Sequence, residues 1–503
     1  MERQRFSPFL LSPFDHFFPP ILFLSEVLYY PTQNKQEAIE DLQLGLSRLF
    51  KLVPCLTGVA DYAHGSDKPN VVEVRSVSAN EDTAPLVEIQ HYPQYSLPTT
   101  VDSDDRERGE RGWSGAAGNE SWRCLTPRFD ETTVPAPVFS SQINVLADGI
   151  ALGLVINHMV FDGMGNGKII DLFERCCRDP TIATSSFSFA AEVETRQSLH
   201  ELGRTGTLPT ANHTSSAVKM EAKQQEQELI PGEGIVYDGT ELNYNFIISD
   251  ERMRLLKSRC NARLPTLIRS LGNEEKGQPK FVSSNDVLTA LLWICNAWVQ
   301  KKEQSSLGVA VNCRERFPKP LPNNYLGNSV AYANCTLPRS ELQCLESWDK
   351  PHQQQSLCQE IIDNEPILDL LTRMAYRIRC RLFSLDADEL GRLAASYYHT
   401  PDWSQILVQR CDILVSSLRT WNIFNLDFTP RLGPVQQFEF LPPTSPAGEC
   451  LIKPARKDRN GNPVWEVMVA LPAAEMEQLC RNPLLNWACS DKSPRLLWAR
   501  AQN

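Results

Sequence analysis

The chain has 503 residues, more than one hydrophobic core ordinarily accommodates, so two domains are expected. Its hydrophobic content of 42% and charged content of 22% are typical of a soluble globular protein. The net charge of −11 argues against a general nucleic-acid-binding surface, which would be basic.

The fifteen cysteines are scattered along the chain, apart from the pair Cys176-Cys177, and form no CxxC. This pattern argues against a disulfide framework or a zinc ribbon and favours reduced, mostly buried thiols in a cytoplasmic enzyme. Prolines and polar residues interrupt the apolar N-terminus, which therefore does not fit a signal peptide. No run approaches the ~20 apolar residues of a transmembrane helix, so no integral membrane association is expected.

The first predicted elements are a strand and an amphipathic helix. A run rich in aromatic and β-favouring residues predicts a strand over 21–30. Asn34 and Glu37 have the spacing of a capping box, which predicts a helix start. Apolar residues then recur at steps of three and four as far as Pro54, so the helix is expected to pack by one face.

A hairpin is predicted next, with strands over 138–146 and 150–156 and a turn at Asp148-Gly149. The second strand ends just before His158 and therefore delivers a histidine to a turn. Beyond Gly163, apolar residues at helical spacing predict a helix. The histidine is thus expected between strand and helix, on a turn that glycines make permissive.

Residues 196–235 are predicted to form a crossover linker. From about residue 190 the chain is rich in Glu, Gln, Thr, Ser and Gly and has few large apolar residues. The predicted organisation is an N-terminal half at 1–195 and a C-terminal half at 236–503.

The C-terminal half mixes strands and helices. Ser283 and Asp286 are expected to cap a strongly apolar helix. Residues 353–398 are mostly helical in pattern. Strands are predicted over 242–248, 307–311, 329–337, 413–416 and 465–471.

His158 is the candidate catalytic residue. A neutral imidazole can take a proton from a hydroxyl or an amine, because its reference pKa of ~6.5 lies near working pH. Asp162, four residues on, is better suited to shaping the turn than to sharing the proton. A His–Asp pair at this spacing is common, so the pair is a weak signal by itself.

Several other short segments accompany this histidine. HxxxDG is followed along the chain by Val311-Asn-Cys-Arg314, Tyr325-Leu-Gly-Asn328, Val415-Ser416-Ser417, and Asp427-Phe428 with Gly433-Pro434. The opening Leu11-Ser-Pro-Phe-Asp15 and the helix entry at Ser283 belong with them. In this order they resemble the plant and fungal CoA-dependent acyltransferases called the BAHD family, and more closely its fungal branch. Each motif is loose, but five in the correct order over nearly the whole chain are specific.

The resemblance implies an α/β (α+β) fold of two similar chloramphenicol-acetyltransferase-like domains of mixed β-sheet and helices, with the active-site channel at their interface. It implies transfer of an acyl group from acyl-CoA, by default acetyl-CoA, to a hydroxyl of a fungal-type secondary metabolite. These two small molecules would be the partners of a cytoplasmic monomer with no tightly bound cofactor. The eight histidines have no HxxH or HxxxH spacing, so no metal site is expected.

The resemblance also implies roles for the HxxxDG residues. His158 would deprotonate the acceptor, which then attacks the thioester carbonyl. Asp162 has two candidate roles, orienting His158 as in a triad or pairing with a distant cation, and the resemblance favours the second with Arg314 as partner. Gly163 would be structural. The family often has another histidine directly before the first, where this chain has Asn157.

Two segments are expected near the cofactor. Tyr325, Gly327 and Asn328 match a family segment beside the cofactor channel, and Gly327 would allow close backbone approach. Ser416 and Ser417 lie where the family has a hydroxyl close to the pantetheine or the acceptor. Neighbouring strand residues point to opposite faces, so the sequence leaves open which serine faces the channel.

The last segment, from Asp427 to Gly433, is expected to be structural and away from the histidine. Thr429 replaces the first glycine of the plant pattern Asp-Phe-Gly-Trp-Gly, and no Trp follows. What stabilises the oxyanion therefore stays open, although preorganised donors normally supply much of the rate.

Two other functions fit part of the pattern. A condensation-domain-like acyltransferase that uses a carrier-bound thioester also carries HHxxxDG, although this chain has no carrier-domain serine motif. A relative that has kept the fold for binding alone is the non-enzymatic alternative. Asn157 and Thr429 favour that alternative, whereas His158, Asp162 and Gly163 oppose it.

Overall fold

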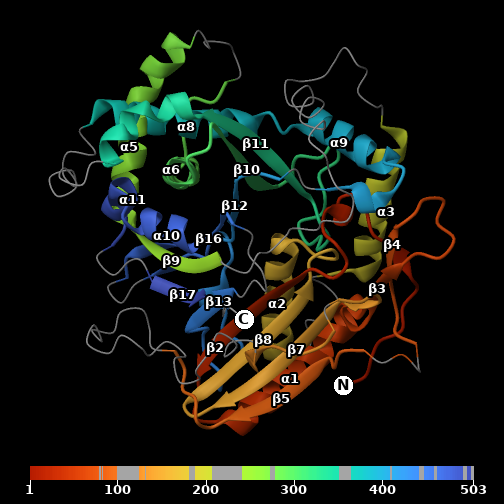
Figure 1. Ribbon diagram of the computed structural model, residues 1–503. Helices are drawn as coiled ribbons and strands as arrows, with labels where there is room; N and C mark the ends of the chain where they lie inside the picture. Colours follow the sequence, from red (N-terminus) through yellow and green to blue (C-terminus); the bar gives the residue numbers. More distant parts are fainter. Residues whose placement is uncertain are drawn as a thin grey trace.

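The structure of the protein is a computed structural model (Figure 1). It describes residues 1–78, 81, 83–98, 124–130, 132–179, 187–206, 241–271, 278–349, 364–407, 410–440, 447–457, 461–490 and 495–499.

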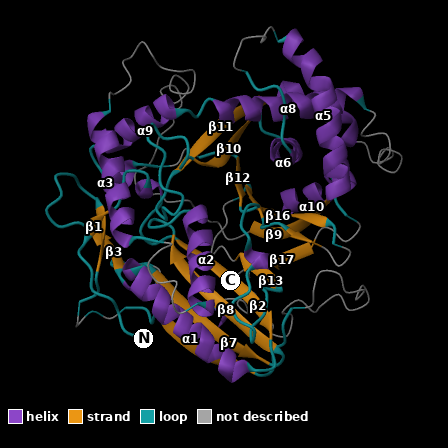
Figure 2. Ribbon diagram, turned by 180° about the vertical axis from the view of Figure 1, so that it is seen from behind, coloured by secondary structure: helices purple, strands orange, loops and turns teal. Residues whose placement is uncertain are grey.

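The N-terminal half is built on a five-stranded sheet. Two helices, α1 (Lys35–Leu52) and α2 (Gly163–Arg178), pack together on one face of it, as Figure 2 shows from behind. The apolar side chains between helices and sheet form one of the two large hydrophobic clusters. The strand order is β13 (Gln437–Phe440), β2 (Phe23–Pro31), β8 (Gly149–Asn157), β7 (Phe139–Leu146) and β5 (Val87–Tyr92).

A small sheet lies beside this one and carries the N-terminal segment of the chain. Its order is β1 (Phe9–Leu10), β4 (Val72–Arg75), β3 (Val59–Tyr62) and β6 (Ala136–Pro137). Two short helices, η1 (Asp15–Phe17) and η2 (Pro54–Thr57), follow β1 and α1 along the chain. The turn at η1 brings the next residues back toward β2, whose first residues pair with the end of β8.

The C-terminal half is built on an eight-stranded mixed sheet. Its order is β11 (Val330–Pro338), β10 (Gln304–Asn312), β12 (Ile413–Ser417), β14 (Glu449–Ile452), β16 (Pro463–Pro472), β9 (Glu241–Ser249) and β17 (Arg495–Ala499), with β15 (Arg456–Lys457) also paired to β16. The pairs β10–β12 and β12–β14 are parallel and the others antiparallel.

Helices of the same half build the second large hydrophobic cluster with this sheet. The apolar helix α6 lies at its centre, and its predicted capping box is present, with Ser283 and Asp286 each accepting the other's backbone N–H. The elements are α5 (Asp250–Ser270), α6 (Ser284–Gln300), η4 (Arg339–Asp349), α8 (Glu365–Phe383), α9 (Ala387–His399), η5 (Trp403–Gln405), η6 (Ile423–Asn425), α10 (Ala473–Cys480) and α11 (Pro483–Ala488).

One strand late in the chain belongs to the sheet of the other half. β13 pairs antiparallel with β2, with Phe438 opposite Leu28, and so forms an edge of the N-terminal sheet. The two sheets are therefore interlinked by the chain itself.

The predicted linker at 196–235 begins inside a helix, which corrects the expectation for its first residues. Helix α3 (Phe189–Thr205) starts at Ser188, whose side chain accepts the N–H of Ala191. It packs against α9 and buries polar side chains, a pattern that apolar periodicity cannot reveal. Residues 207–235 lie outside the described part, and the division into 1–195 and 236–503 stays a prediction.

The predicted capping box of α1 is also wrong. Asn34 is the N-cap residue but makes no side-chain cap hydrogen bond. Its own N–H is donated to the Thr32 hydroxyl at 3.2 Å, and Glu37 pairs with Arg431 instead. The start of α1 is therefore confirmed, but the predicted capping box is not its cause.

Among the described residues, no helix has the length and apolar character needed to span a membrane.

Candidate active site

His158 lies directly after β8, and its backbone position is fixed from two sides. Its N–H donates to the Leu22 carbonyl at 2.8 Å. The preceding Asn157 is fully buried, and its Nδ2 donates to Pro20 O at 2.7 Å while its Oδ1 accepts the N–H of Met159 at 3.0 Å. Asn157, which stands where the family often has a histidine, thus builds the turn that presents His158.

The imidazole of His158 is half-buried and stacks on the ring of Phe18, with ring centroids 3.8 Å apart and planes 26° from parallel. Its Nδ1 is buried and meets no hydrogen-bond partner in the described residues. Burial lowers the pKa of His158, and the nearby backbone and the Asp162 charge oppose that shift. The lowered pKa favours the neutral form of the ring near pH 7.

Asp162 points away from the imidazole and pairs with Arg314. The two guanidinium nitrogens Nη1 and Nη2 donate to the two carboxylate oxygens, each at 2.9 Å. The carboxylate also accepts the N–H of Gly165 at 2.7 Å, as N-cap of α2, and that of Ser329 at 3.1 Å. These four bonds occupy the carboxylate, so the arrangement is the structural pairing and not a triad.

The Arg314 side chain joins the two halves from a buried position, with 3% of it exposed against 0% for Asp162. Beyond the carboxylate, it donates to the carbonyls of Tyr325 at 3.0 Å and Gly327 at 2.8 Å. One guanidinium thus connects α2 of the first half to the loop that follows β10 in the second.

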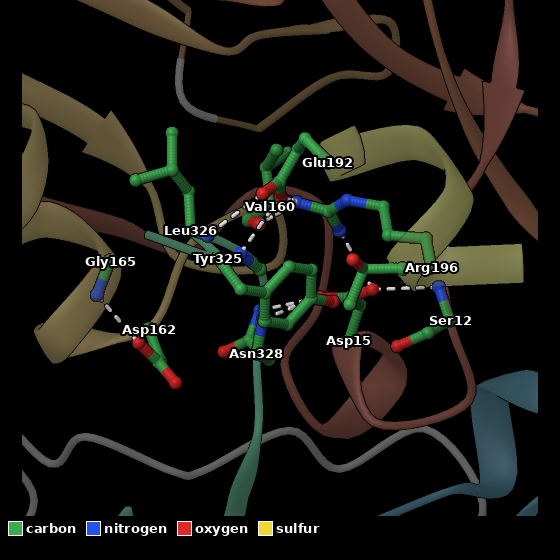
Figure 3. Close-up of polar contacts among 12 residues, drawn as sticks. Ser12, Asp15, Val160, Asp162, Gly165, Glu192, Arg196, Tyr325, Leu326 and Asn328 are labelled. Carbon is green, nitrogen blue, oxygen red and sulfur yellow. Dashed lines mark hydrogen bonds and ion pairs between the residues drawn. The ribbon is translucent and has the colours of Figure 1, made fainter. Parts of the chain in front are cut away.

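A second buried network holds the Tyr325–Asn328 segment (Figure 3). The Glu192 carboxylate on α3 accepts the N–H groups of Leu326 at 2.9 Å and Gly327 at 3.0 Å. The Asp15 carboxylate on η1 accepts both the N–H and the Nδ2 of Asn328 at 2.9 Å. Two carboxylates from the first half therefore bind three consecutive residues of the second.

Arg196 binds both of these carboxylates. It donates to Asp15 at 2.8 Å, to Glu192 at 3.2 Å and to the Val160 carbonyl at 2.8 Å. Its guanidinium carbon also lies 5.7 Å from the centre of the Tyr325 ring. The sequence pattern assigns no role to either Arg196 or Glu192. Their i,i+4 spacing is the available signal, but Arg196 falls at the start of the predicted linker and no apolar pattern marks a helix there.

The predicted cofactor segment is buried and contacts the backbone of the turn that carries His158; its residues are Tyr325, Gly327 and Asn328. Asn328 Nδ2 donates to the carbonyls of His158 at 3.2 Å and Met159 at 2.9 Å. The Tyr325 hydroxyl is buried and unpaired within the described residues. Their expected contact with the cofactor stays a prediction. The contacts shown fix the turn.

The glycines after the histidine serve close packing rather than an unusual turn. Gly163 and Gly165 lie in the first turn of α2, and neither has a positive φ, which corrects the permissive-turn expectation. A Cβ on Gly165 would lie 1.8 Å from the Leu326 carbonyl oxygen. Glycine at 165 is therefore required by the approach of the Tyr325–Asn328 segment.

Ser416 and Ser417 lie on opposite faces of β12. Ser416 pairs with Leu451 of β14, whose side chain packs in the cluster of the N-terminal half. Ser417 shares its face with Val415, which packs in the C-terminal cluster. Both serines are half-buried, and the pairing with Leu451 places Ser416 on the face toward the His158 half.

The segment from Asp427 to Gly433 packs against the first half. Phe428 is fully buried between the rings of Tyr30 and Phe173, at centroid distances of 5.4 and 5.2 Å. Gly433 has φ +70°, a left-handed conformation that favours glycine, and it leads into β13. These contacts agree with a structural position for the segment.

Among the described residues, no three His, Cys, Asp or Glu side chains come together in a group that could hold a metal ion. None of the fourteen cysteines in the described residues forms a disulfide there.

Comparison with known proteins gives matches over most of the chain. Residues 118–484 match the model of the family described as Transferase family, and residues 25–177 match that of the trichothecene 3-O-acetyltransferase-like N-terminal domain. The O-acetyltransferase cpsE of Aspergillus campestris is 35% identical, covering 96% of each chain. The fumigaclavine B O-acetyltransferase easN of Aspergillus fumigatus is 30% identical, covering 97% of this chain and 99% of its own.

Solved structures show the same fold. TRI101 of F. graminearum, complexed with coenzyme A and deoxynivalenol, aligns with a TM-score of 0.65 at 18% identity, over 94% of this chain and 97% of its own. Vinorine synthase aligns with a TM-score of 0.58 at 16% identity, over 98% of this chain and 96% of its own.

Proposed function

From the membership of this chain in the Transferase family of BAHD-type acyltransferases, we propose that it transfers an acetyl group from acetyl-CoA to a hydroxyl of a fungal secondary metabolite. Two relatives at 30% identity or more bear names of O-acetyltransferases, and one name specifies fumigaclavine B. The coenzyme A in the TRI101 structure supports acyl-CoA as a co-substrate rather than a tightly bound cofactor. The chain is expected to act as a cytoplasmic monomer.

The observation that carries the mechanism is the position of His158 directly after β8, with its ring stacked on Phe18 and its Asp162 neighbour occupied by Arg314. Burial lowers the pKa of His158, which favours the neutral imidazole that a general base needs. In the proposed reaction the imidazole takes the hydroxyl proton as the acceptor oxygen attacks the thioester carbonyl. The tetrahedral intermediate then collapses, and the carbon–sulfur bond breaks. The imidazolium returns its proton to the leaving thiolate, so the products are an acetyl ester and CoA.

Ser416 is the proposed contact for the pantetheine or the acceptor, because it lies on the sheet face toward the His158 half. For Tyr325, Gly327 and Asn328 we propose an indirect part, in which their backbone and amide contacts fix the turn beside the cofactor.

The test is acetyl transfer to fumigaclavine B and a panel of other alcohols, read by mass spectrometry of the product. The acetyl group is supplied either as acetyl-CoA or bound to a carrier protein. We expect product from acetyl-CoA, and a decrease of ~10²–10⁴-fold in folded His158→Ala. Product from the carrier-bound donor alone would contradict the choice of donor. Near-normal turnover by His158→Ala would remove the histidine from the mechanism.

A further inference from the structure

One short N-terminal segment, residues 15–22, contacts His158 both at its ring and at its backbone. Phe18 stacks on the imidazole at 3.8 Å, and the Leu22 carbonyl accepts the His158 N–H at 2.8 Å. Through Asn328, the Asp15 carboxylate is also linked to the His158 carbonyl. Ring and backbone are therefore held by the same stretch of chain, which lies some 140 residues before the histidine.

The Phe18 ring is itself held in place. Phe18 directly follows η1 and has an extended backbone, with φ −113° and ψ 143°. It packs against the hydrophobic clusters of both halves. Its neighbour Phe17 is buried beside the ring of Tyr397, at a centroid distance of 4.9 Å. The Phe18 ring therefore lies at the boundary of the halves, in contact with both hydrophobic clusters.

We propose that Phe18 is a positioning residue for His158, whose ring fixes the plane of the imidazole and shields one of its faces from water. This role rests on the proposed function of His158 as general base. The buried Nδ1 has no partner at hydrogen-bond distance and geometry among the described residues, although the backbone of His158 and Phe161 lies near the ring and acts to raise its pKa. The stacked phenyl ring is therefore the close contact that sets the plane of the imidazole.

Removing the phenyl ring has two expected consequences. The imidazole gains freedom to rotate, and a displacement of about 1 Å from the reactive geometry can reduce a rate ~10²-fold. Water also reaches the imidazole, so the burial that lowers the pKa of His158 is relieved and its pKa rises toward its ordinary value.

The charged groups on the surrounding elements would not themselves cause this rise in the pKa of His158. Asp162 on α2 is paired with Arg314, and Asp15 on η1 is paired with Arg196. Neither ion pair includes Phe18, so substitution of Phe18 leaves both pairs intact. A shift in the pKa of His158 would therefore report the loss of the phenyl ring itself.

The experiment measures carbethoxylation of His158 by diethyl pyrocarbonate, which reacts with neutral imidazole, as a function of pH. Peptide mass spectrometry resolves His158 from the other histidines, and no acceptor is needed. In Phe18→Leu we expect a higher titration midpoint and a faster limiting rate at alkaline pH. Phe18→Tyr keeps the ring and should stay close to wild type. Phe18→Met serves as the second variant if Phe18→Leu does not fold.

Turnover is then compared with an acceptor that the wild-type enzyme acetylates. In Phe18→Leu we expect kcat to fall ~10–10²-fold with little change in the KM for acetyl-CoA, and we expect Phe18→Tyr to restore it. An unchanged midpoint, reactivity and kcat in folded Phe18→Leu or Phe18→Met would overturn the positioning role. Failure of the proposed function is distinguishable, because it appears as normal turnover in His158→Ala, whatever the reactivity of the Phe18 variants.

Discussion

At the scale of single residues, the contact with Arg314 determines the role of Asp162. With its carboxylate satisfied by two guanidinium nitrogens and two backbone N–H groups, Asp162 holds α2 and the second half together. The motif resemblance predicted this pairing from the sequence. It could not predict Glu192 and Arg196, because their partners lie far away along the chain and charged residues in a polar stretch usually indicate solvent exposure.

Removing either partner of this pair should therefore destabilise the protein. Asp162→Ala and Arg314→Ala each leave an uncompensated buried charge, at a cost of about 3–5 kcal/mol, and the double variant should lose less than the sum. Urea denaturation measures the free energies of unfolding. Asp171→Ala, which breaks an exposed pair with Arg175 on the same helix, is the control and should cost below about 1 kcal/mol. Additive losses would show that the pair is not coupled.

The lowered pKa of His158 sets the pH dependence of the reaction. A general base is active when neutral, so kcat/KM should be constant at neutral pH and fall as the pH drops through the pKa of His158. Because burial lowers that pKa, the acid limb should lie below the ordinary histidine value of ~6.5. Initial rates with an alcohol that does not ionise provide the measurement. A midpoint above that value would contradict the burial of the imidazole.

At the scale of elements, strands and helices with regular apolar patterns were predictable, whereas α3 was not. The predicted hairpin and the helix after it correspond to β7, β8 and α2 because their apolar residues recur at the period of each element. Helix α3 instead buries Glu192 and Arg196 against the Tyr325–Asn328 segment. Its inward face is charged, so no apolar stripe marks it.

A buried carboxyl between β2 and α2 makes the contact of these elements sensitive to pH. Glu26 accepts Asn166 Nδ2 at 2.6 Å, its other oxygen is buried, and burial raises its pKa to about 8. The folded state keeps the proton over a range where the unfolded state, with a pKa near 4.5, has lost it. Stability should therefore be fully present below about pH 4.5 and decline as the pH rises through about 8.

The variant Glu26→Gln tests this dependence. Each pKa unit corresponds to about 1.4 kcal/mol, so a loss on the order of 5 kcal/mol between about pH 4.5 and pH 8 should be absent in the variant. Denaturation curves at several pH values measure the difference, and Glu88→Gln, at a half-buried position of β5, is the matched control. Parallel pH profiles for wild type and Glu26→Gln would show that Glu26 titrates normally.

At the scale of the whole molecule, the two halves are connected by buried charge and by a shared sheet. Lys453 after β14 pairs with Glu439 of β13 at 2.8 Å and with Glu466 of β16 at 3.1 Å, linking the two sheets a second time. The sequence predicted the order of most strands along the chain. It could not predict that β13 joins the N-terminal sheet, because strand pairing between distant segments depends on tertiary contacts that local patterns do not encode.

Because the two halves are connected, binding of the co-substrate should stabilise the whole molecule against unfolding. Free CoA at about 100 times its dissociation constant should raise the free energy of unfolding by about 2.7 kcal/mol, without added metal. Differential scanning fluorimetry with and without a chelator tests this, with adenosine as the control ligand. No shift at saturating CoA would contradict the choice of co-substrate, and a shift abolished by the chelator would show that a metal takes part.

The late position of β13 has a consequence for biosynthesis. The edge of β2 is complete only when residues 437–440 pair with it, although the rest of that sheet has been made by residue 157. Ribosomes add roughly 5–20 residues per second, so the edge of β2 in the nascent chain stays unpaired for on the order of tens of seconds. An unpaired edge strand can form hydrogen bonds with strands of other chains and so promote aggregation. Folding of this protein in the cell therefore depends on protecting one strand of an unfinished sheet until translation is almost over.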